Sequence, residues 1–464
     1  MCRSKKLPSC LLFTACLLLA AGCTSQEKSQ ASGTTGVTVF EGARLIPGDG
    51  SAAIEGSEFI VQRGVITRIA RKGELTALAG ATRVDLTGKT VMPALISAHV
   101  HPGFQKGLTY AAGNYTRATV INDLNRALYY GVAAVMSQGI ERGEIAYQIR
   151  ADQEAGKLGG ARLLVAGRGI GAPKAGPGAA AYAGIAYEVT TEAETRQAVR
   201  ELAAKKVNAV KVWVDDRGGR APRLSPALFR AAIDEAHQLG FRISAHVFYH
   251  ADAFELAEAG IDSFAHLVRD QEMTDALIAS VVRRGVYVMP NLGGTERNTH
   301  TATPGWMDEQ YLFALLNDTT SPENIKRMRG LFAPRDPAVV ETVRRTYGIL
   351  QRSLAKLNTA GARIILGCDT GLPDHFFGYA EQRELELMAA AGMTPMQVIV
   401  AATSRPAEYL ELKNTGSLAP GKSADFLVLD ANPLADIRNT RRIAKVYIKG
   451  VEVDRAALRA RIAK

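Results

Sequence analysis

The sequence predicts an α/β protein, a (β/α)8 TIM barrel joined to a small β-sandwich domain that both ends of the chain build. Two observations lead to this prediction. Between residues 93 and 405, eight short apolar runs alternate with stretches that carry helix-start signals, as expected of repeated βα units around a parallel barrel. On either side of this region the runs are short, β-like and separated by glycine and charged turns, which is typical of a small all-β unit.

Residues 1–22 read as a targeting segment rather than as part of the fold. They begin with basic side chains and continue with an apolar run over 11–21, which is too short for a comfortable membrane span. The run ends in Leu19-Ala20-Ala21-Gly22-Cys23 and resembles the lipobox of bacterial lipoproteins, where the cysteine is lipidated and becomes the first residue. We therefore expect a chain anchored through Cys23 in the bacterial cell envelope, with a plain secretory signal as the alternative.

Thr24 follows the cysteine, and by the same resemblance this favours the outer membrane, facing the periplasm. Residues 23–36 are mostly Ser, Thr, Gln and Gly, which predicts a flexible tether. After loss of the signal and lipidation of Cys23, Cys368 is the one free thiol. No intramolecular disulfide is then expected, although the compartment is oxidising.

The composition argues against nucleic-acid binding. The formal net charge is +10, but the basic residues are scattered and aromatic residues make up only 6% of the chain. A nucleic-acid site would require a dense basic stripe or a recognisable motif. We interpret the charge as a contribution to solubility and to attraction of anionic substrates or surfaces.

The β-sandwich is predicted from residues 37–92 and 406–464. Its expected strands are the β-like runs 37–40, 59–62, 65–69 and 82–86 at one end and 424–429 and 444–450 at the other. Two similar β-rich ends around a different middle suggest one sandwich.

The barrel is predicted over residues 93–405. Its expected strands are the run that ends at His101 and the runs 133–138, 161–166, 209–214, 242–247, 263–268, 286–292 and 363–367. Helix starts are indicated by the capping box Thr191-x-x-Glu194 and by Ser225-Pro226 and Thr394-Pro395, which place an N-cap before a first-turn proline. A polar insertion at 293–350 is expected to be partly helical and to form a lid or a subunit contact, so a homo-oligomer is one possibility.

Two histidines end the first barrel strand, where the chemistry of a TIM barrel is found. The stretch 91–101 is apolar and closes with His99-Val100-His101. Residues i and i+2 of a strand point to the same face, with Cα atoms about 7 Å apart. Two such imidazoles suit a divalent transition metal, although the pair alone is equally compatible with solvated histidines.

Other strand ends carry titratable residues too. Lys211 lies inside the hydrophobic run 209–214, His246 and His266 end the fifth and sixth strands, and Asp369 follows the eighth. Lysine is rarely buried without a partner, and burial favours its neutral amine. Such an amine can add carbon dioxide and become a carbamate that bridges two metals, whereas a lysine that reaches to solvent from the strand end is the alternative.

With these residues the chain resembles the amidohydrolase superfamily, specifically its binuclear, imidazolonepropionase-like or prolidase-like branch. Segment 416–425 also matches the family's return to the sandwich. The resemblance implies two divalent metals, with zinc expected. His99, His101 and Asp369 would hold one metal, His246 and His266 the other, and carboxylated Lys211 would bridge them. The family usually has Gly and Asp where this chain has Ala94 and Ser97, and Ser97 shares the strand face of His99.

The implied reaction is hydrolysis of an amide, cyclic amide or peptide C–N bond by a water that the two metals share. Asp369 is the candidate to take the proton of the water and deliver it to the departing nitrogen. A cyclic amidohydrolase or a deaminase is the alternative, although many deaminases of the superfamily use one metal and lack the strand-four lysine. A non-catalytic envelope lipoprotein that binds ligands is a third hypothesis.

Candidate substrate contacts follow the strands as well. Arg168 and Arg269 are suited to a substrate carboxylate, as in a dipeptide or an N-acyl amino acid, unless they pair with structural acids. Tyr249 or His250 is a candidate partner of the scissile carbonyl, and His375 follows strand eight. The stretch Gly167–Ala172 loosely matches a dinucleotide fingerprint, but the prolines after it cannot open a helix, so we interpret it as a flexible active-site loop.

Overall fold

Eight parallel strands close into the predicted barrel in the computed structural model, which describes residues 36–75, 80–178, 180–332 and 336–462. The predicted signal peptide, the lipidation site Cys23 and all but the last residue of the tether lie outside the described residues. The barrel strands are β7 (Leu95–Val100), β10 (Val132–Ser137), β11 (Arg162–Val165), β14 (Val210–Trp213), β15 (Ile243–His246), β16 (Ser263–Ala265), β17 (Tyr287–Met289) and β18 (Arg363–Ile364).

Backbone hydrogen bonds join these strands around the whole circle. β11, β10 and β7 pair in parallel, and so do β14 to β18 in chain order. The two arcs meet where Asn208 N donates to Val165 O at 2.7 Å and where Ala98 N donates to Leu366 O at 2.8 Å. The predicted TIM barrel is therefore confirmed.

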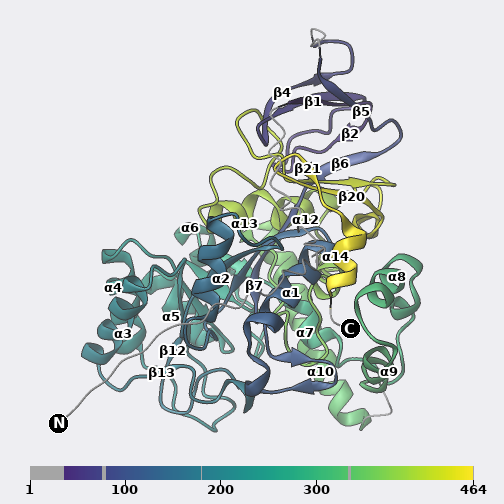
Figure 1. Ribbon diagram of the computed structural model, residues 1–464. Coiled ribbons are helices and arrows are strands. Elements are labelled where there is room, and N and C mark those ends of the chain that lie inside the picture. The colour runs from purple at the N-terminus through teal and green to yellow at the C-terminus, as the bar shows by residue number, and fades with distance from the viewer. Residues whose placement is uncertain (1–35, 76–79, 179, 333–335, 463–464) are drawn as a thin grey trace, which may run out of the picture. The chain divides into compact units, whose positions relative to one another are not determined.

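Helices surround the strands (Figure 1). The capping box predicted at Thr191 opens α3, Ser225 precedes α4, and Thr394 caps α12. The surrounding helices are α1 (Arg117–Tyr129), α2 (Ile145–Glu154), α3 (Glu192–Ala204), α4 (Pro226–Gln238), α5 (His250–Ala259), α6 (Asp275–Arg284), α10 (Pro337–Thr359), α11 (Tyr379–Ala390) and α12 (Pro395–Ala402). Among the described residues, no helix combines the length and apolar character that a membrane crossing requires.

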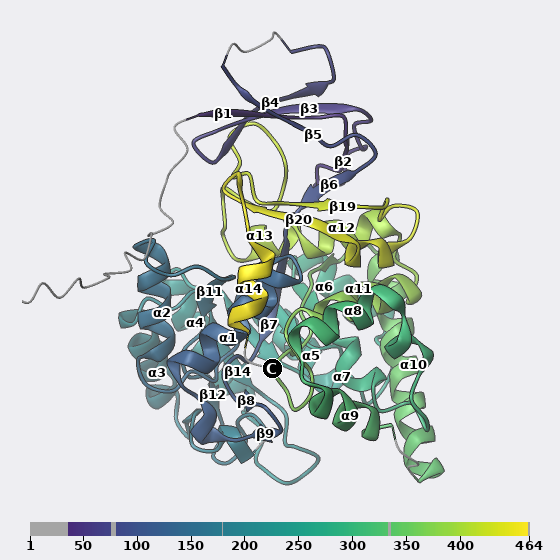
Figure 2. The same ribbon diagram turned by 45° about the vertical axis from the view of Figure 1, so that its right-hand side comes forward.

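Both ends of the described chain contribute to one β-sandwich, as predicted (Figure 2). One sheet contains β1 (Val37–Glu41), β3 (Ser57–Gln62), β4 (Val65–Arg71) and β5 (Thr82–Asp85), and the other contains β2 (Arg44–Leu45), β6 (Thr90–Pro93), β19 (Phe426–Leu429), β20 (Ile443–Ile448) and β21 (Val451–Glu452). Phe40 stacks on Phe59 at 4.9 Å between ring centroids, and Phe426 stacks on Tyr447 at 4.6 Å. Because Phe40 also meets Phe426 edge-on at 5.2 Å, the two ends share one aromatic core.

The segment after residue 403 packs against the barrel before the chain enters the sandwich. Helix α13 (Ser404–Tyr409) and the turn after it bury Tyr409, Leu410 and Leu412 in one cluster with barrel residues such as Ile96 and Met136. The domain boundary predicted at 405/406 therefore falls inside a helix that belongs to the barrel core. A further helix that the sequence analysis did not anticipate, α14 (Arg455–Arg461), lies against α1.

The insertion predicted at 293–350 is helical. It contains α7 (Leu292–Glu296), the 3-10 turn η3 (Gly305–Asp308), α8 (Gln310–Thr319), α9 (Pro322–Gly330) and the first part of α10. Its role as a lid or a subunit contact stays a prediction.

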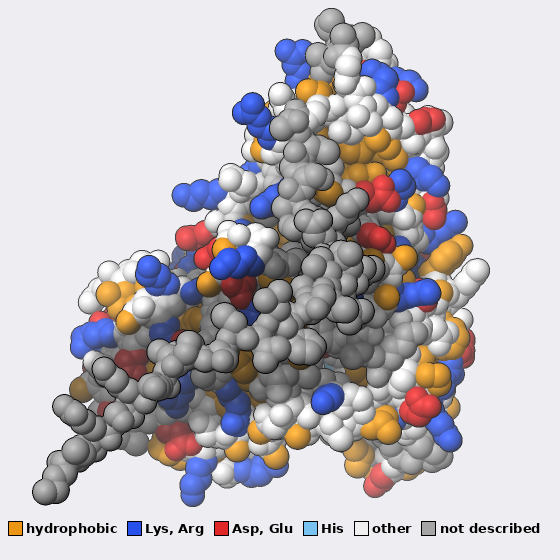
Figure 3. Space-filling model, in the orientation of Figure 1, with side chains coloured by type: hydrophobic (Ala, Val, Ile, Leu, Met, Phe, Trp, Pro, Cys, Tyr) orange, Lys and Arg blue, Asp and Glu red, His pale blue; other side chains and the backbone are white. Residues whose placement is uncertain are grey.

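Charged side chains lie intermixed on the face of the molecule drawn in Figure 3. Lys and Arg appear there singly or in small groups, with Asp and Glu among them. This distribution is in keeping with the scattered charge of the sequence.

Candidate metal centre

The two histidines of the first barrel strand point at one carboxylate. All residues of β7 are buried, and His99 and His101 are 1% and 6% exposed. His99 Nε2 lies 3.3 Å from Asp369 Oδ1, and His101 Nε2 lies 2.7 Å from the same oxygen. The i, i+2 alternation of the strand therefore places both imidazoles on one face, as the sequence indicated.

Asp369 is held at this point by its backbone. Its φ is +57°, a left-handed conformation that non-glycine residues adopt rarely, and its N–H donates to His99 O at 3.1 Å. Burial alone would raise the pKa of Asp369, but the facing His99 and His101 hold it well below its usual range. The carboxylate is therefore ionised throughout the neutral pH range.

His246 and His266 form the second pair of imidazoles. Their ring centroids lie 4.5 Å apart, and His266 Nε2 lies 3.8 Å from Asp369 Oδ2. Burial, with further contributions from Arg269, lowers the pKa of both histidines well below the usual value. Both rings are therefore neutral near pH 7, which is the form that binds metals.

Lys211 lies on β14, which pairs with the strand that ends in His246. It is 0% exposed, and its Nζ has no hydrogen-bond partner among the described residues. Burial lowers the pKa of Lys211 to about 7, although Asp369 opposes the shift. Its charge in turn lowers the pKa of His99 and of His246, so the amine lies within electrostatic reach of both pairs.

These side chains fit divalent metal ions. Ligand atoms of His99, His266 and Asp369 lie within 4.8 Å of one another, and His101 shares the oxygen that His99 faces. Neutral imidazoles with a carboxylate are a donor set for zinc and similar ions. The unpartnered buried amine of Lys211 adds the group that could take up carbon dioxide.

The five predicted substrate residues differ in how far their side chains are already engaged by other parts of the protein. Arg168 donates to Ile185 O at 2.6 Å and to Ala186 O at 3.1 Å, and its guanidinium lies 4.0 Å over the Tyr187 ring, so its donors are engaged by the loop before α3. Tyr249 donates its hydroxyl hydrogen to Asp216 at 2.8 Å.

Three further predicted residues complete this group. His250 opens α5, with Nε2 2.9 Å from Thr274 Oγ1. Arg269 lies closer to the centre, because Asp369 and Asp215 are among the charges that oppose the lowering of its pKa by burial. His375 is buried, with Nε2 3.1 Å from Cys368 O, and burial lowers its pKa to about 4.

Several residues at the centre were not anticipated. Asp215 is 5% exposed and faces His246 Nε2 at 3.5 Å. Arg217 donates to Ala175 O at 2.9 Å and adds positive charge near Lys211. Asn291 lies against two of the histidines. Asp215 and Asn291 both occur just after a barrel strand, and this position was the signal that could have found them.

Ser97, where the resembled family usually has Asp, contacts a carboxylate from another element. Its hydroxyl donates to Glu381 Oε1 at 3.1 Å, and Thr370 Oγ1 donates to the same oxygen at 2.7 Å. Gly378 N donates to the second carboxylate oxygen at 2.7 Å. A buried acid from α11 thus supports the strand that carries His99 and the turn that carries Asp369.

The glycine-rich stretch after β11 is explained by packing. Residues Ile170–Gly171 form β12, which pairs with β14. A Cβ at Gly169 would lie 1.9 Å from the Trp213 ring, so no larger side chain fits there. The loop lies beside the Lys211 strand and has no helix directly after it, unlike a dinucleotide-binding loop.

Comparisons with known proteins show which family and fold this chain shares. The Amidohydrolase family model matches residues 90–453. An uncharacterized protein of Mycobacterium tuberculosis is 28% identical over 360 residues, which are 77% of this chain and 83% of that protein. The structure of a putative prolidase from Bifidobacterium longum superimposes with a TM-score of 0.70 at 27% identity, over 92% of this chain and 98% of that one. That of a Xaa-Pro dipeptidase with bound methionine gives 0.69 at 21% identity, over 90% and 99%.

Proposed function

The chain belongs to the amidohydrolase family, and we propose that it hydrolyses an amide or peptide C–N bond at a pair of divalent metal ions. The observation that carries the proposal is Lys211, a fully buried amine without a hydrogen-bond partner among the described residues. An uncompensated buried amine is costly, and this one acts electrostatically on His99 and His246, one histidine of each pair. A purely structural role gives no reason for this arrangement.

We assign the ligands from the contacts of Asp369. His99 and His101, which face its Oδ1, hold one ion together with Asp369, and His246 and His266 hold the other. Zinc fits this donor set. When bound, the ions supply Lewis-acid activation of the scissile carbonyl and of the attacking water.

Carboxylation of Lys211 would complete the site. The neutral amine attacks carbon dioxide, a C–N bond forms, and the nitrogen releases one proton to solvent. The product is a carbamate with one negative charge and two oxygen donors. A pKa near 7 leaves about half of the amine neutral at pH 7, so this reaction is accessible under ordinary conditions.

Asp369 is the residue that we propose to handle the proton of the reaction. Its carboxylate is ionised at neutral pH because His99 and His101 lower its pKa. Its left-handed backbone fixes where the oxygens point. From this position it can accept the proton of the attacking water and donate it to the leaving nitrogen.

A substrate with a carboxylate, such as a dipeptide or an N-acyl amino acid, suits the charges around the centre. Arg269 and Arg217 both contribute positive charge next to His246, and arginine binds carboxylates with two parallel hydrogen bonds. Arg269 is the better supported candidate, because Arg168 already donates to two backbone carbonyls. The two structural neighbours, a putative prolidase and a Xaa-Pro dipeptidase, are in keeping with such a substrate.

We further propose that the protein is a lipoprotein of the bacterial cell envelope, anchored at Cys23 and facing the periplasm. The support is the stretch Leu19–Cys23 after an apolar run. Replacing the cysteine, Cys23→Ala, is expected to move the protein from the detergent phase to the aqueous phase in a phase-separation assay. Equal partitioning of both forms would rule the anchor out.

The experiment that tests the proposed function compares the wild type with Lys211→Ala and with Lys413→Ala, an exposed lysine that serves as the control. Each zinc-loaded protein is analysed for metal content and assayed against a library of dipeptides and N-acyl amino acids. We expect about two metals per chain and hydrolysis from the wild type and the control, and loss of both from Lys211→Ala. Retention of both metals by Lys211→Ala would refute the carbamate bridge, and a doubly loaded wild type that cleaves no C–N bond would refute the activity.

A further inference from the structure

The side-chain amide of Asn291 lies between two of the histidines of the metal centre. The structure assigns the atom nearest the two rings as Asn291 Nδ2, 2.9 Å from His99 Nδ1 and 2.8 Å from His266 Nδ1. All three side chains are buried. One amide thus contacts two imidazoles that come from the first and the sixth strands of the barrel.

The local backbone directs this amide inward. Asn291 follows β17 and Pro290 and has a φ of +50°, a left-handed conformation that asparagine tolerates better than most residues. The next two backbone N–H groups, of Leu292 and Gly293, donate to the Glu384 carboxylate at 2.7 and 2.8 Å. This carboxylate fixes the turn from which the Asn291 side chain extends.

The two histidines present opposite edges to Asn291 and to Asp369. Their Nδ1 atoms contact the amide, whereas their Nε2 atoms face the Asp369 carboxylate at 3.3 and 3.8 Å. A neutral imidazole that binds a metal through Nε2 carries its hydrogen on Nδ1. That hydrogen requires an acceptor, and metal-binding histidines regularly have one.

When both Nδ1 atoms carry hydrogen, only the orientation with the amide oxygen toward the rings satisfies both histidines. An amide NH2 group cannot accept a hydrogen bond, but an amide oxygen can accept two. Rotation of the amide by 180° exchanges its oxygen and nitrogen without changing its shape. Asn291 Oδ1, as the structure assigns it, has no hydrogen-bond partner among the described residues, so no competing contact opposes this rotation.

We propose that Asn291 is a positioning residue whose Oδ1 accepts the Nδ1–H of His99 and that of His266 at the same time. The inference rests on the proposed function, in which these histidines hold different metal ions. One amide then sets the tautomer of both His99 and His266, which hold different metal ions, and also sets the spacing of these two rings. His101 is not positioned in this way, because its buried Nδ1 has no hydrogen-bond partner among the described residues.

The test compares Asn291→Gly and Asn291→Asp with the wild type. Glycine suits the positive φ, so this variant removes the acceptor with little backbone strain. Aspartate keeps an oxygen acceptor at the same place. Asn324→Ala is the matched control, because Asn324 is another buried asparagine whose Oδ1 has no partner among the described residues.

Zinc affinity is measured by competition with a chromophoric chelator, and folding is checked by circular dichroism. We expect Asn291→Gly to bind zinc about 10–100-fold more weakly, while Asn291→Asp and Asn324→Ala stay within a few fold of the wild type. In histidine-selective 15N spectra of the zinc-loaded wild type, His99 and His266 should both carry hydrogen on Nδ1.

Two outcomes would overturn the inference. Either Asn291→Gly binds zinc as tightly as the wild type, or Asn291→Asp is weakened as much as Asn291→Gly. Both differ from failure of the proposed function, which would appear as a wild type that does not bind two metals or cleave a C–N bond.

Discussion

Lys211 is the residue whose chemistry depends most on its surroundings. In water its amine would be almost wholly protonated at pH 7, but inside the barrel burial lowers its pKa to about 7. Desolvation disfavours the ammonium ion, and the facing Asp369 carboxylate recovers only part of that loss. One apolar strand environment thus converts an ordinary cation into a nucleophilic amine.

This shift predicts the pH dependence of metal loading. Only the neutral amine reacts with carbon dioxide, and because the pKa is lowered, the neutral fraction rises as the pH rises through 7. At constant dissolved carbon dioxide, metal-free protein given zinc should assemble its centre about tenfold faster at pH 8 than at pH 6, since the neutral fraction grows by that factor for a pKa of 7. Stopped-flow measurement of zinc uptake provides the rates. A ratio of about a hundred would show instead that the amine keeps the pKa of a solvated lysine.

Ser97 and Glu381 give a second prediction for single residues. The Glu381 carboxyl is buried, and burial raises its pKa. Ser97→Asp would restore the residue usual in the resembled family but would place a second carboxyl against the first. We expect Ser97→Asp to lower the free energy of unfolding by on the order of 3 kcal/mol, as measured by urea denaturation.

The double variant Ser97→Asp/Glu381→Gln is the control, because it leaves one carboxyl in the pair. It should recover most of the lost stability. If Ser97→Asp alone were as stable as the wild type, the two carboxyl groups would not repel each other in the folded protein.

Among single residues, the sequence pointed to candidate site residues where a polar or titratable side chain stands in an apolar strand. A lysine in an apolar run and two histidines on one strand face are visible without coordinates. Asn291 was not visible, because a neutral amide after a strand has many ordinary explanations. Its contacts with His99 and His266 depend on a left-handed turn and on Glu384, which is far away in the sequence.

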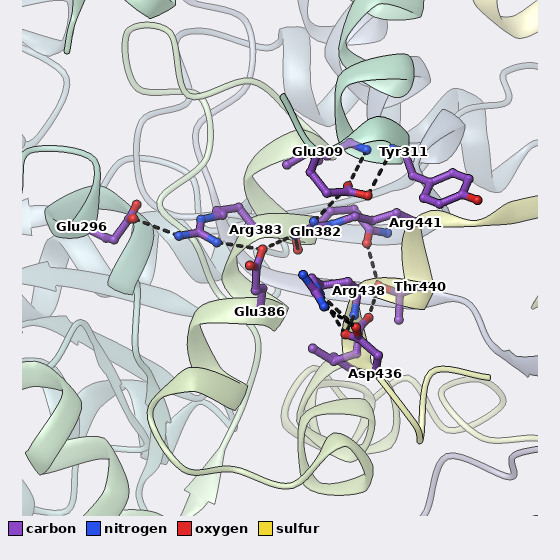
Figure 4. Close-up of polar contacts among 12 residues, drawn as sticks. Glu296, Glu309, Tyr311, Gln382, Arg383, Glu386, Asp436, Arg438, Thr440 and Arg441 are labelled. Atoms are coloured by element: carbon purple, nitrogen blue, oxygen red, sulfur yellow. Dashed lines mark hydrogen bonds and ion pairs between the residues drawn. The ribbon is translucent and has the colours of Figure 1, made fainter. Parts of the chain in front are cut away.

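Between elements, a buried ion-pair network connects the helical insertion to the C-terminal segment (Figure 4). Arg383 on α11 donates to Glu296 of α7 at 2.9 Å and pairs with Glu386 at 2.7 Å. Arg441, in the 3-10 turn η4 (Ile437–Arg441), donates to Glu309 before α8 at 3.2 Å and also pairs with Glu386. Its side chain is 0% exposed, so the network holds together four parts of the chain that are separate in the sequence: α7, the start of α8, α11 and η4.

Removal of Arg441 from this network should be costly. Arg441→Met removes the buried cation that pairs with Glu309 and leaves Glu386 with Arg383 alone. Loss of one partner of a buried pair typically lowers the free energy of unfolding by about 3–5 kcal/mol. Arg438→Met is the matched control, because Arg438 pairs with Asp436 at 2.6 Å while 54% exposed. That surface pair should contribute at most about 1 kcal/mol. Chemical denaturation of both variants measures the difference, and equal losses would mean that burial of Arg441 adds nothing.

The elements were predictable where each follows a local rule. The eight strands are short apolar runs between helix signals, and the caps of α3 and α12 are encoded in four residues each. The domain boundary was not, because α13 carries apolar residues whose burial is decided by the barrel core beneath β7 and β10. Arg441 was equally hidden, since no local pattern separates a buried arginine from the exposed one three positions before it.

On the scale of the whole molecule, the proposed ligands join distant parts of the barrel. His99, Lys211 and His246 lie on β7, β14 and β15, whereas His266 and Asp369 follow β16 and β18. No short segment of the unfolded chain contains this set, so the metals are expected to bind the folded barrel far more tightly than the unfolded chain. Binding to the native state alone raises the free energy of unfolding by about 4.1 kcal/mol when free metal is a thousand times the dissociation constant.

Metal removal should therefore lower the thermal stability of the whole barrel. We expect the melting temperature to fall by several degrees when the zinc-loaded protein is treated with a chelator, and to recover and rise with the free zinc concentration when metal is restored. Asp369→Asn is the control, because it replaces the carboxylate that faces three of the histidines with a neutral amide. The melting temperature of this variant should respond far less to the chelator. Differential scanning calorimetry records both proteins. A wild-type melting temperature that stays the same over a thousandfold range of free zinc would contradict a metal centre that clamps the barrel, because linkage requires any ligand specific to the native state to shift the transition.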